Sequence, residues 1–444
     1  MNTEKHYISV APSNGGQTFG FSAGNPEVRF DLASRGKLNT QDLRLSGTLK
    51  IIKTSDGTAL SDFTKDVNID PYSGVGSCVE QLTISSRAYS SRNLEAIYHH
   101  PRLLSGMNSV MRSKSQMDCG EFHQSGAKGI GFDTFAERND QSRPDEFNAG
   151  GQVKAMKKAL VRSGGMKFST RLMSGFLMGG SNQNSQVNIE VLGGLSLTLS
   201  MSSTSNVLYG ADASDYHYEI SNLFLNASIN DVPAQEQMAL AQKGEVDMSF
   251  LSYTSLYNTI NSTNFNVVHR LNLGAVISTF VSFIPTAFIN NYAQNGLGQY
   301  NPCVEQLEWQ KDSARFPVDN TLDAKLESGI ACGEQLQTYP DVLSNYMEAF
   351  KNAKDIQRSQ LNPVVSGYEV QRTHKVGAFA VGCAYDAVSG SGSDFRVSTA
   401  GFNLVSKLDD PDNPGNSINF AAYSYYLARN QVRIVKQQGI QVVS

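Results

Sequence analysis

Cysteine and histidine are the residue types best suited to bind a metal or to act in nucleophilic catalysis, and this chain has five cysteines and seven histidines. The cysteines follow no CxxC or other metal-ligand spacing, and an odd number cannot all pair within one chain. His99 and His100 are adjacent, but no histidine stands at a zinc-ligand spacing from a cysteine. We therefore expect surface or helix-face histidines and free thiols in a reducing compartment, at Cys78, Cys119, Cys303, Cys332 and Cys383.

Two other motifs match an ion or phosphate site only in part. Asp409, Asp410 and Asp412 could offer carboxylates to calcium, but DDPDNPG lacks the order and the distal Glu of an EF-hand loop, which favours a solvated acidic turn. The segment Ser389–Asp394 is rich in Gly, yet no Lys-Ser/Thr pair follows it, so it reads as a flexible turn. A hydrolase would need carboxylates or histidines clustered on facing strands. We expect no catalytic, cofactor or metal-binding residue and predict that the protein is not an enzyme.

Positive charge is concentrated in one place, between residues 154 and 171. This basic segment could face a genome or an acidic membrane leaflet, although a solvated surface balanced by nearby acids is the more common arrangement. Its role stays open. The formal net charge of -4 gives the chain no overall attraction for nucleic acid, so no sequence-specific nucleic acid partner is expected. The basic residues are Lys154, Lys157, Lys158, Arg162, Lys167 and Arg171.

The hydrophobic pattern of the chain has mainly a period of two, which indicates strands with one buried face. Apolar and polar residues alternate over 43–51, 187–201 and 223–229, and Gly193 within the second of these suggests a bend or bulge in one long strand or two collinear ones. Residues 267–283 form a nearly continuous apolar strand region, and 432–443 close the chain with another β-rich segment. The fold class is therefore all-β, with long loops between strands.

Two segments have helical spacing instead. Over 93–111 the apolar residues recur near every third or fourth position, with Pro101 expected to kink or divide the helix. In the second half, Thr338 and Asp341 form the start of a capping box, and apolar residues follow on one helical face to Ile356. We predict one inserted helix in each half.

The polar connector at 231–245 divides the chain into two parts, each of a size that one β-sandwich can occupy. We predict an N-terminal arm at 1–25, a first sandwich at 26–230 and a second sandwich at 246–444. The arm has neither the order of a secretion signal nor a polybasic stretch, so it is expected to be a flexible docking arm. The longest apolar stretch, Ala275–Ile289, is too short to cross a bilayer as a helix.

The order of these features resembles the double jelly-roll major capsid proteins of polinton-like viruses, virophages and membrane-containing tailless phages. An early strand, a Ser/Asn/Gly turn and a helix with a Leu-Glu-x-Ile start are followed by a long alternating strand. A Tyr-rich entry to the last strand of the first half and then the opening of the second half come after it. The blocks that carry the resemblance are Cys78–Met107, Met166–Ser202, Asp215–Pro233, and Ser282–Gly296 with Ser313–Leu322.

The resemblance implies two consecutive eight-stranded jelly rolls and a structural subunit of an icosahedral virion of a DNA virus. Such subunits form homotrimers that act as pseudo-hexameric capsomers and tile the shell, in contact with neighbouring capsomers and with penton and minor capsid proteins. An internal membrane beneath the shell is a further partner that the family allows. The expected location is the virion, after assembly inside the host cell.

Two other classes of protein remain as alternatives. A β-sandwich could serve as a carbohydrate-binding or adhesion protein, but sugar platforms favour tryptophan and this chain has only Trp309. A minor or penton capsid protein is the other alternative, and such proteins commonly have one jelly roll. Two sandwich-sized halves with matching patterns therefore favour the major capsid protein.

Overall fold

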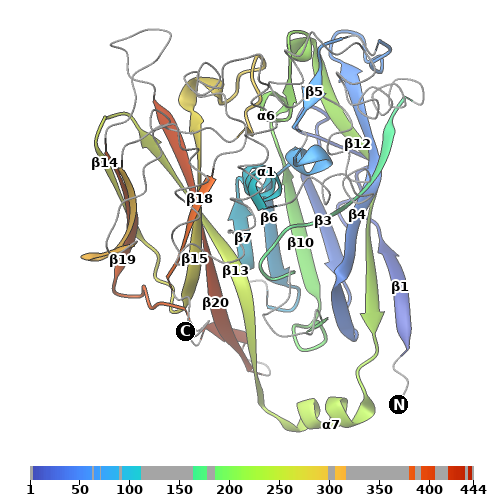
Figure 1. Cartoon of the computed structure of the whole chain (residues 1–444). Coiled ribbons are helices and arrows are strands. Elements are labelled where there is room, and N and C mark those ends of the chain that lie inside the picture. The colour runs from blue at the N-terminus through green and yellow to red at the C-terminus, as the bar shows by residue number, and fades with distance from the viewer. Residues whose placement is uncertain are drawn as a thin grey trace.

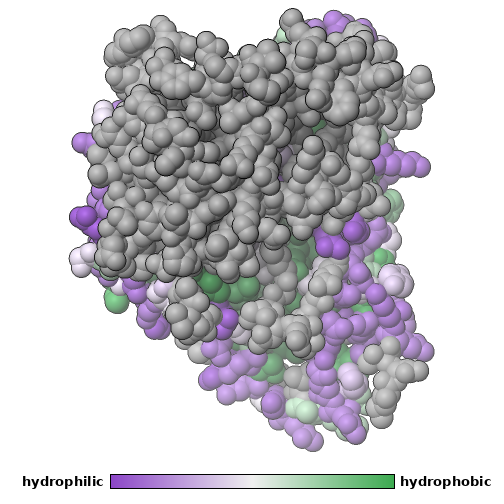
Figure 2. Space-filling view, in the orientation of Figure 1, coloured by the Kyte–Doolittle hydropathy of each residue, from purple (hydrophilic) through white to green (hydrophobic). Residues whose placement is uncertain are grey.

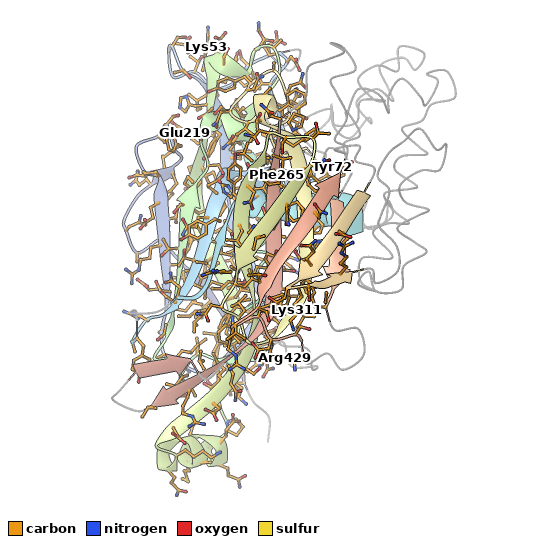
Figure 3. All side chains as sticks on the ribbon, turned by 90° about the vertical axis from the view of Figure 1, so that its left-hand side faces the viewer. Lys53, Tyr72, Glu219, Phe265, Lys311 and Arg429 are labelled. Carbon is orange, nitrogen blue, oxygen red and sulfur yellow. The ribbon has the colours of Figure 1, made fainter. Side chains whose placement is uncertain are left out.

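The computed structural model describes residues 4–62, 65–70, 72–89, 93–111, 164–177, 186–298, 306–316, 380–385, 392–405, 419–435 and 439–442. Its strands form two β-sandwiches that lie side by side, and the chain passes between them at the base through helix α7 (Ala234–Gln242) (Figure 1). From the side, the strands run along the long axis of the molecule, from the end marked by Lys53 to α7 (Figure 3). Within the described residues, no helix has the length and apolar character needed to cross a membrane.

The first sandwich has two sheets, and all of its paired strands are antiparallel. One sheet has the order β1-β12-β4-β8, with β2 and β9 paired to it, and the other has the order β3-β10-β6-β7. The first sheet contains β1 (Lys5–Val10), β2 (Thr18–Phe19), β4 (Lys37–Lys53), β8 (Met166–Arg171), β9 (Gln186–Asn188) and β12 (Tyr216–Asn230). The second contains β3 (Glu27–Leu32), β6 (Val79–Ser86), β7 (Asn93–Tyr98) and β10 (Leu195–Met201).

The second sandwich repeats this arrangement. One sheet has the order β13-β20-β15-β18, with β21 paired to β20, and the other has the order β14-β19-β16-β17. The first of these contains β13 (Glu245–Ile260), β15 (Val276–Pro285), β18 (Ala380–Ala384), β20 (Phe420–Val435) and β21 (Gly439–Val442). The second contains β14 (Phe265–Arg270), β16 (Gln306–Lys311), β17 (Ala314–Phe316) and β19 (Thr399–Val405).

The strand order identifies both sandwiches as jelly rolls. Numbered along the chain, the strands of the main path have the order one, eight, three, six in one sheet and two, seven, four, five in the other, and both sandwiches follow it. This is the double-sheet Greek-key arrangement of a jelly roll. The prediction of an all-β chain with two consecutive jelly rolls is confirmed. The helix predicted at 338–356 lies outside the described residues.

Short elements connect the strands around the top of the first sandwich. They are β5 (Asn68–Ile69), which pairs with β11 (Leu208–Tyr209), the 3-10 helices η1 (Gly74–Cys78) and η2 (Ala213–Asp215), and the short helix α6 (Thr204–Val207). In the second sandwich, η3 (Thr286–Phe288) follows β15 directly. Helix α1 (His100–Met111) follows β7 and lies between the two sandwiches in Figure 1.

Each sandwich has an apolar core, and each core includes some residues from the other half of the chain. The first core, which includes Phe30 and Leu199, also contains Phe250, Val432 and Ile434 from the second half of the chain. The second core contains three residues from the first half, namely Ile97, Leu103 and Met107. The described surface toward the base in Figure 2 is largely hydrophilic, with smaller hydrophobic areas. The sandwiches are therefore distinct in topology but interlocked in packing.

The helix predicted over 93–111 is wrong in its first part. Residues 93–98 form β7, which pairs with β6 so that Ile97 lies opposite Leu82, and only His100–Met111 are helical. His99 has a φ of 54° and separates the two elements. Pro101 does not kink the helix, because it lies in the first turn, where its missing N–H costs nothing. Pairing with a neighbouring strand outweighs the helical spacing of this short segment.

Two long strands predicted from periodicity are each divided between two sheets. Gly193 and Gly194, with φ of 65° and 101°, turn the chain between β9 and β10, which belong to different sheets. Residues 267–283 contain β14 and β15, again in different sheets, with a turn between Arg270 and Val276. Because both strands of each pair face the same core, the alternation over 187–201 and the nearly continuous apolar character of 267–283 extend across the turn and do not reveal it.

The N-terminal segment contributes to the first jelly roll. Residues 5–10 form β1, in register with β12 from Val10 opposite Leu225 to Lys5 opposite Asn230. Residues 5–10 are therefore not a flexible arm, because half-buried Ile8 and Val10 alternate with polar residues and pack against the first core. The connector at 231–245 contains α7 and ends where β13 begins at Glu245.

Candidate functional site

The boundary between the two jelly rolls is where buried charged and polar side chains of the described residues concentrate. It is formed by β7 and α1 of the first half and by β13 and β20 of the second. β7 and β13 each stand at the edge of their own sheet and lie next to each other. We call this region the junction, and it consists of β7, α1, residues 173–177, and the parts of β13 and β20 that face them.

Glu95 of β7 is the central residue of the junction. Its side chain is buried, and its carboxylate accepts four hydrogen bonds. The Oε1 atom accepts the N–H of Gly175 at 3.0 Å and the N–H of Tyr253 at 2.6 Å. The Oε2 atom accepts the N–H of Phe176 at 3.1 Å and the hydroxyl of Ser174. One carboxylate thus joins β7, the segment after β8, and the first strand of the second jelly roll.

Close backbone packing surrounds this carboxylate. A Cβ atom on Gly175 would lie 2.8 Å from the Cα and 2.9 Å from the backbone N of Ser252, so only glycine fits between the segment and β13. The rings of Phe176 and Phe250 are in edge-to-face contact, with centroids 5.2 Å apart. On the other side, the N–H of Tyr98 donates to the Ser255 hydroxyl at 2.9 Å.

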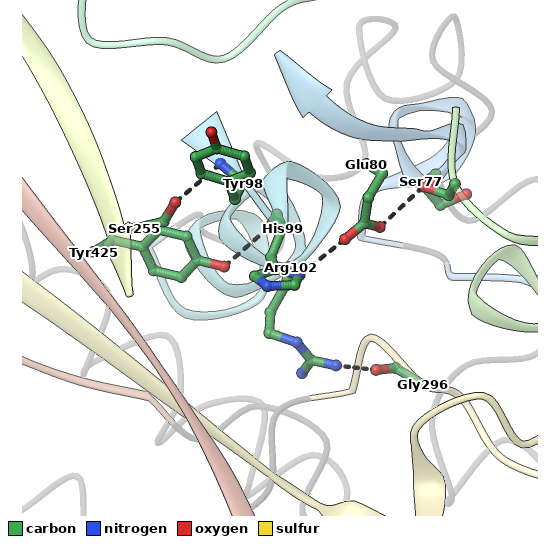
Figure 4. A network of polar contacts seen from close by, with 9 residues as sticks. Ser77, Glu80, Tyr98, His99, Arg102, Ser255, Gly296 and Tyr425 are labelled. Atoms are coloured by element: carbon green, nitrogen blue, oxygen red, sulfur yellow. Dashed lines mark hydrogen bonds and ion pairs between the residues drawn. The ribbon is translucent and has the colours of Figure 1, made fainter. Parts of the chain in front are cut away.

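Arg102 of α1 extends the junction to the loop after β15, where its guanidinium reaches Gly296 (Figure 4). The side chain is buried, donates to the carbonyls of Gly296 and Gly298, and its guanidinium lies 4.3 Å from the ring centroid of Tyr423. It therefore fixes the loop after β15 and stacks on β20 at the same time. The hydroxyl of Tyr425 donates to the carbonyl of His99 at 2.9 Å, which holds the start of α1 against β20.

The loop after β15 is held on the first jelly roll at two further points. The side-chain amide of Asn295 donates to Asp70 at 2.8 Å, and the backbone N–H of Gly210 donates to the carbonyl of Tyr292 at 2.7 Å. Gly210 has a φ of 129°, and a Cβ there would lie 2.1 Å from the carbonyl oxygen of Asp66. The second jelly roll is thus attached to the first at its top as well as along β7.

Burial shifts the protonation of several junction residues. Burial raises the pKa of Glu95, against the opposing effect of the four hydrogen bonds that its carboxylate accepts. For Glu80 of β6, beside the junction, burial also acts to raise the pKa, but the hydrogen bonds from His99 and Ser202 and the nearby positive charge of Arg102 outweigh it and leave that pKa lowered. For His100, which lies beside them on α1, burial lowers the pKa to about 4. The neutral ring of His100 still makes a hydrogen bond, because its Nε2 donates to the carbonyl of Met173 at 2.9 Å.

The histidines and cysteines predicted from the sequence have separate environments where the structure describes them. His99 bonds to Glu80 at 2.8 Å and His100 is buried, so the adjacent pair has two different roles. Cys78 is a buried free cysteine, and burial raises the pKa of its thiol to about 12. Cys383 belongs to β18. The other three cysteines lie outside the described residues.

The charged motifs fall mostly outside the described residues. This holds for Asp409, Asp410 and Asp412, and for the basic residues from Lys154 to Arg162. Lys167 and Arg171 are exposed on β8, where Arg171 lies opposite Arg44 in the strand register. Positive charge from Arg171 contributes to the lowered pKa of Asp42, after the hydrogen bonds from Lys5 and Ser228. This part of the basic segment therefore lies on a strand face that also carries acids.

One cluster in the described residues has the donor types of a metal site. Glu4, His6 and Asp231 place one potential ligand atom each within 4.8 Å of one another. His6 Nε2 lies 3.1 Å from Asp231, and the Arg35 guanidinium lies 3.6 Å from the same carboxylate. A cation already offsets part of the negative charge there, so the cluster acts as an ion-pair group that ties β1 to the end of β12.

The junction residues were not predicted from the sequence. Glu95 has one sequence signal, which is a carboxylate at a position of β7 flanked by Leu94 and Ile97, both of which are buried. Arg102 has none, because the two carbonyls to which it donates lie 194 and 196 residues away along the chain. Buried charged residues of this kind become recognisable only when their partners are in place.

Comparison with known proteins gives a match at the level of fold. No protein-family model and no curated protein matches the sequence. The crystal structure of PBCV-1 VP54, fitted into a cryo-EM reconstruction of the virophage Sputnik, is similar over 100% of this chain and 98% of its own, with 11% identity and a TM-score of 0.56. The cryo-EM structure of the Sputnik virophage is similar over 99% of this chain and 89% of its own, with 8% identity and a TM-score of 0.55.

A third structure, a quasi-atomic model of the PBCV-1 virus capsid, is similar over 100% of this chain and 97% of its own, with 11% identity and a TM-score of 0.52. These similarities extend across both sandwiches and the junction between them. The chain therefore has the double jelly-roll fold that these structures share.

Proposed function

We propose that this protein is the major capsid protein of a tailless icosahedral DNA virus and that it acts as a structural subunit, not as an enzyme. The observation that carries the proposal is the likeness to PBCV-1 VP54 over nearly the whole length of both chains, with two jelly rolls in tandem. In this function three copies associate into a pseudo-hexameric capsomer, and capsomers tile the virion shell.

The repeated strand order supports assembly into a trimer. Two jelly rolls of the same order within one chain present similar shapes twice, so three chains can supply six such units around one axis. A head-to-tail contact between unlike faces generates a closed ring when its rotation closes. The two outer sheets in Figure 1, one with β1 and one with β14, are the faces that such a ring would bring together.

Exposed apolar side chains on these outer sheets support the same arrangement. Tyr7 on β1 is 76% exposed and Phe224 on β12 is 41% exposed, on the same sheet of the first jelly roll. Val268 on β14 is 59% exposed on the outer sheet of the second jelly roll. A contact between these faces would remove the three side chains from water, which is favourable by about 25 cal/mol per Å² of apolar surface buried.

The position of the single tryptophan argues against the carbohydrate-binding alternative. Trp309, the only tryptophan of the chain, is 1% exposed and belongs to the second core, so it cannot form a platform for a sugar ring. A penton or minor capsid protein would be expected to have one jelly roll, whereas this chain has two. Of these alternatives, the role of a major capsid protein is the one that uses both jelly rolls.

Further properties follow from the proposed function. We infer that the partners are neighbouring capsomers and the penton and minor capsid proteins, and that the protein is located in the virion. The division into jelly rolls at 26–230 and 246–444 is proposed with the first boundary extended to include β1. An underlying membrane and the genome are the two candidates that the basic segment could face, and Lys167 and Arg171 are its described residues.

The test is the mass of the purified protein. Native mass spectrometry or light scattering should give a particle of three times the chain mass of 48.3 kDa, and electron microscopy should show blocks with a hexagonal outline. At high concentration these blocks should form flat or curved hexagonal arrays. A protein that stays monomeric over the whole concentration range and hydrolyses a glycan or ester would refute the proposal.

A further inference from the structure

We propose that Glu95 and Gly175 act as positioning residues that set the angle between the two jelly rolls, and that this angle allows three copies to close into a capsomer. The second part of the proposal rests on the proposed function. The first part depends only on the structure of the single chain and can be tested without assembly.

The first argument concerns the two sheet edges. β7 and β13 are neighbouring edge strands, yet they belong to different sheets. Edge strands that face each other normally join through backbone hydrogen bonds. Here side chains stand between them, because Glu95 accepts the N–H of Tyr253 and Ser255 accepts the N–H of Tyr98. The strands are thus held next to each other without becoming one sheet.

The second argument concerns the orientation of the Glu95 carboxylate. Its two oxygens accept from three backbone N–H groups and one hydroxyl, and these donors come from two separate segments. Ser174, Gly175 and Phe176 fix the carboxylate plane relative to the first jelly roll. The bond from Tyr253 then fixes β13 relative to that plane. A single rigid group therefore relates one jelly roll to the other.

Gly175 sets the closest approach at the same place. Its missing side chain allows the segment after β8 to lie against the backbone of Ser252. A methyl group there would meet backbone atoms at 2.8 and 2.9 Å, and these cannot rotate away as the end of a side chain can. A larger residue must therefore move β13 away from the first jelly roll or tilt it.

The angle matters because a closed ring repeats it. Six jelly rolls around one axis turn by about 60° at each step, and three of the six steps lie within chains. An altered angle within the chain changes all three of these steps together, and the contacts between chains must absorb the difference. Small errors at this junction are thus expected to oppose closure of the trimer even when each chain is folded.

Two substitutions at Glu95 separate the reach of the side chain from its charge. Glu95→Gln keeps the length and one carbonyl oxygen, which can still accept from Gly175 and from Tyr253 of β13. Its amide group can donate to Ser174, and the N–H of Phe176 is the one donor that loses its acceptor. Glu95→Asp keeps the charge but is shorter by about 1.5 Å, the length of one carbon–carbon bond. It cannot reach both segments at once. If the length of the side chain sets the angle, the Gln variant should form trimers and the Asp variant should not. If the negative charge sets the angle, the Asp variant should form trimers and the Gln variant should not.

Gly175→Ala tests the same angle without changing a polar group. Its control is Gly244→Ala, because Gly244 stands just before β13 and a Cβ there would meet nothing within 4 Å. The control for the charge change is Glu219→Gln on β12, whose carboxylate bonds to His217 away from the junction. Both controls are expected to match the wild type in every measurement.

The measurements are small-angle X-ray scattering of the single chain under dissociating conditions, and the trimer fraction by native mass spectrometry. For Glu95→Asp and Gly175→Ala we expect circular dichroism like the wild type, a changed interdomain scattering profile, and at least a tenfold loss of trimer. Unchanged scattering profiles for both variants would overturn the proposal. Changed profiles with full trimer formation would overturn the second part only. If the wild type itself forms no trimer, the proposed function fails, while the scattering profiles still test Glu95 and Gly175.

Discussion

Replacement of Arg102 by methionine tests how strongly the top of the junction holds the two jelly rolls together. Methionine keeps an apolar stem of similar length over Tyr423 but removes the donors to the carbonyls of Gly296 and Gly298. A hydrogen bond that involves a charged group contributes about 1.5–3 kcal/mol, and a desolvated cation–π contact contributes about 2 kcal/mol. A sulfur–aromatic contact recovers about 1 kcal/mol. For the two hydrogen bonds and the cation–π contact together, less the sulfur–aromatic contact, we expect a loss of about 4–7 kcal/mol in the free energy of unfolding.

The expected shift in Tm follows from the size of the cooperative unit. With an unfolding entropy of about 2.1 cal/mol/K per residue, a chain of 444 residues that unfolds as one unit loses about 1 °C per kcal/mol, so the variant should melt about 4–7 °C lower. Calorimetry measures this shift. Hydrogen exchange should in addition become faster in the loop from Tyr292 to Gly298, because Arg102 holds that loop directly.

Arg396→Met is the control for this experiment. Arg396 is an exposed residue that pairs with Asp394 two positions earlier in the same loop. Its replacement should leave both the Tm and the exchange of residues 292–298 unchanged, since exposed ion pairs contribute little to stability. The reasoning about Arg102 would be refuted if its variant kept the wild-type Tm and slow exchange in that loop.

Three further predictions concern other parts of the chain. Burial lowers the pKa of His100 from 6.5 to about 4, so between these two pH values the folded state binds fewer protons than the unfolded state. About 3 kcal/mol of stability should therefore be lost as the pH falls from above 6.5 to below 4. Denaturant titrations across this range should show a smaller loss for His100→Gln, and an equal loss would exclude His100 as a source. Cys78 in the native protein should resist alkylation by iodoacetamide at pH 8, because its thiol is buried and has a pKa of about 12. Peptide mass spectrometry after labelling measures this, and rapid modification would contradict the prediction by showing that the site opens. A fragment of residues 1–230 should fail to fold stably, because its core lacks Phe250, Val432 and Ile434, and a cooperative melting transition of the fragment would contradict this.

The sequence predicts the elements whose burial is visible in a local pattern. Leu43 to Ile51 alternate with polar residues because one face of β4 is buried and the other is not. The division of 267–283 into two strands could not be predicted in this way, because β14 and β15 face the same core and the pattern continues through the turn. The start of α1 was misplaced because β7 is stabilised by pairing with β6, which the local sequence does not report.

The junction was beyond prediction for a different reason. The donors to Glu95 are separated from it by 79 to 158 residues along the chain, so no spacing rule connects them. Gly175 stands in a Ser-Gly turn and gives no sign that the backbone of Ser252 approaches it. Residues that join two domains depend on the relative placement of those domains, and this placement follows only after both sandwiches are formed.

The polar junction produces an angle between the two jelly rolls that neither direct strand pairing nor a purely apolar contact would produce. Direct backbone pairing of β7 with β13 would merge two sheets and impose the ordinary twist between neighbouring strands, about 20–25°. A purely apolar contact would leave the N–H of Tyr253 buried without an acceptor, at a cost of about 1–3 kcal/mol. Glu95 satisfies that N–H together with those of Gly175 and Phe176, and it does so from a side chain whose length sets the spacing between the edges. Along the edge between β7 and β13, the angle between the jelly rolls is thus set by one carboxylate and the glycine beside it and not by sheet twist.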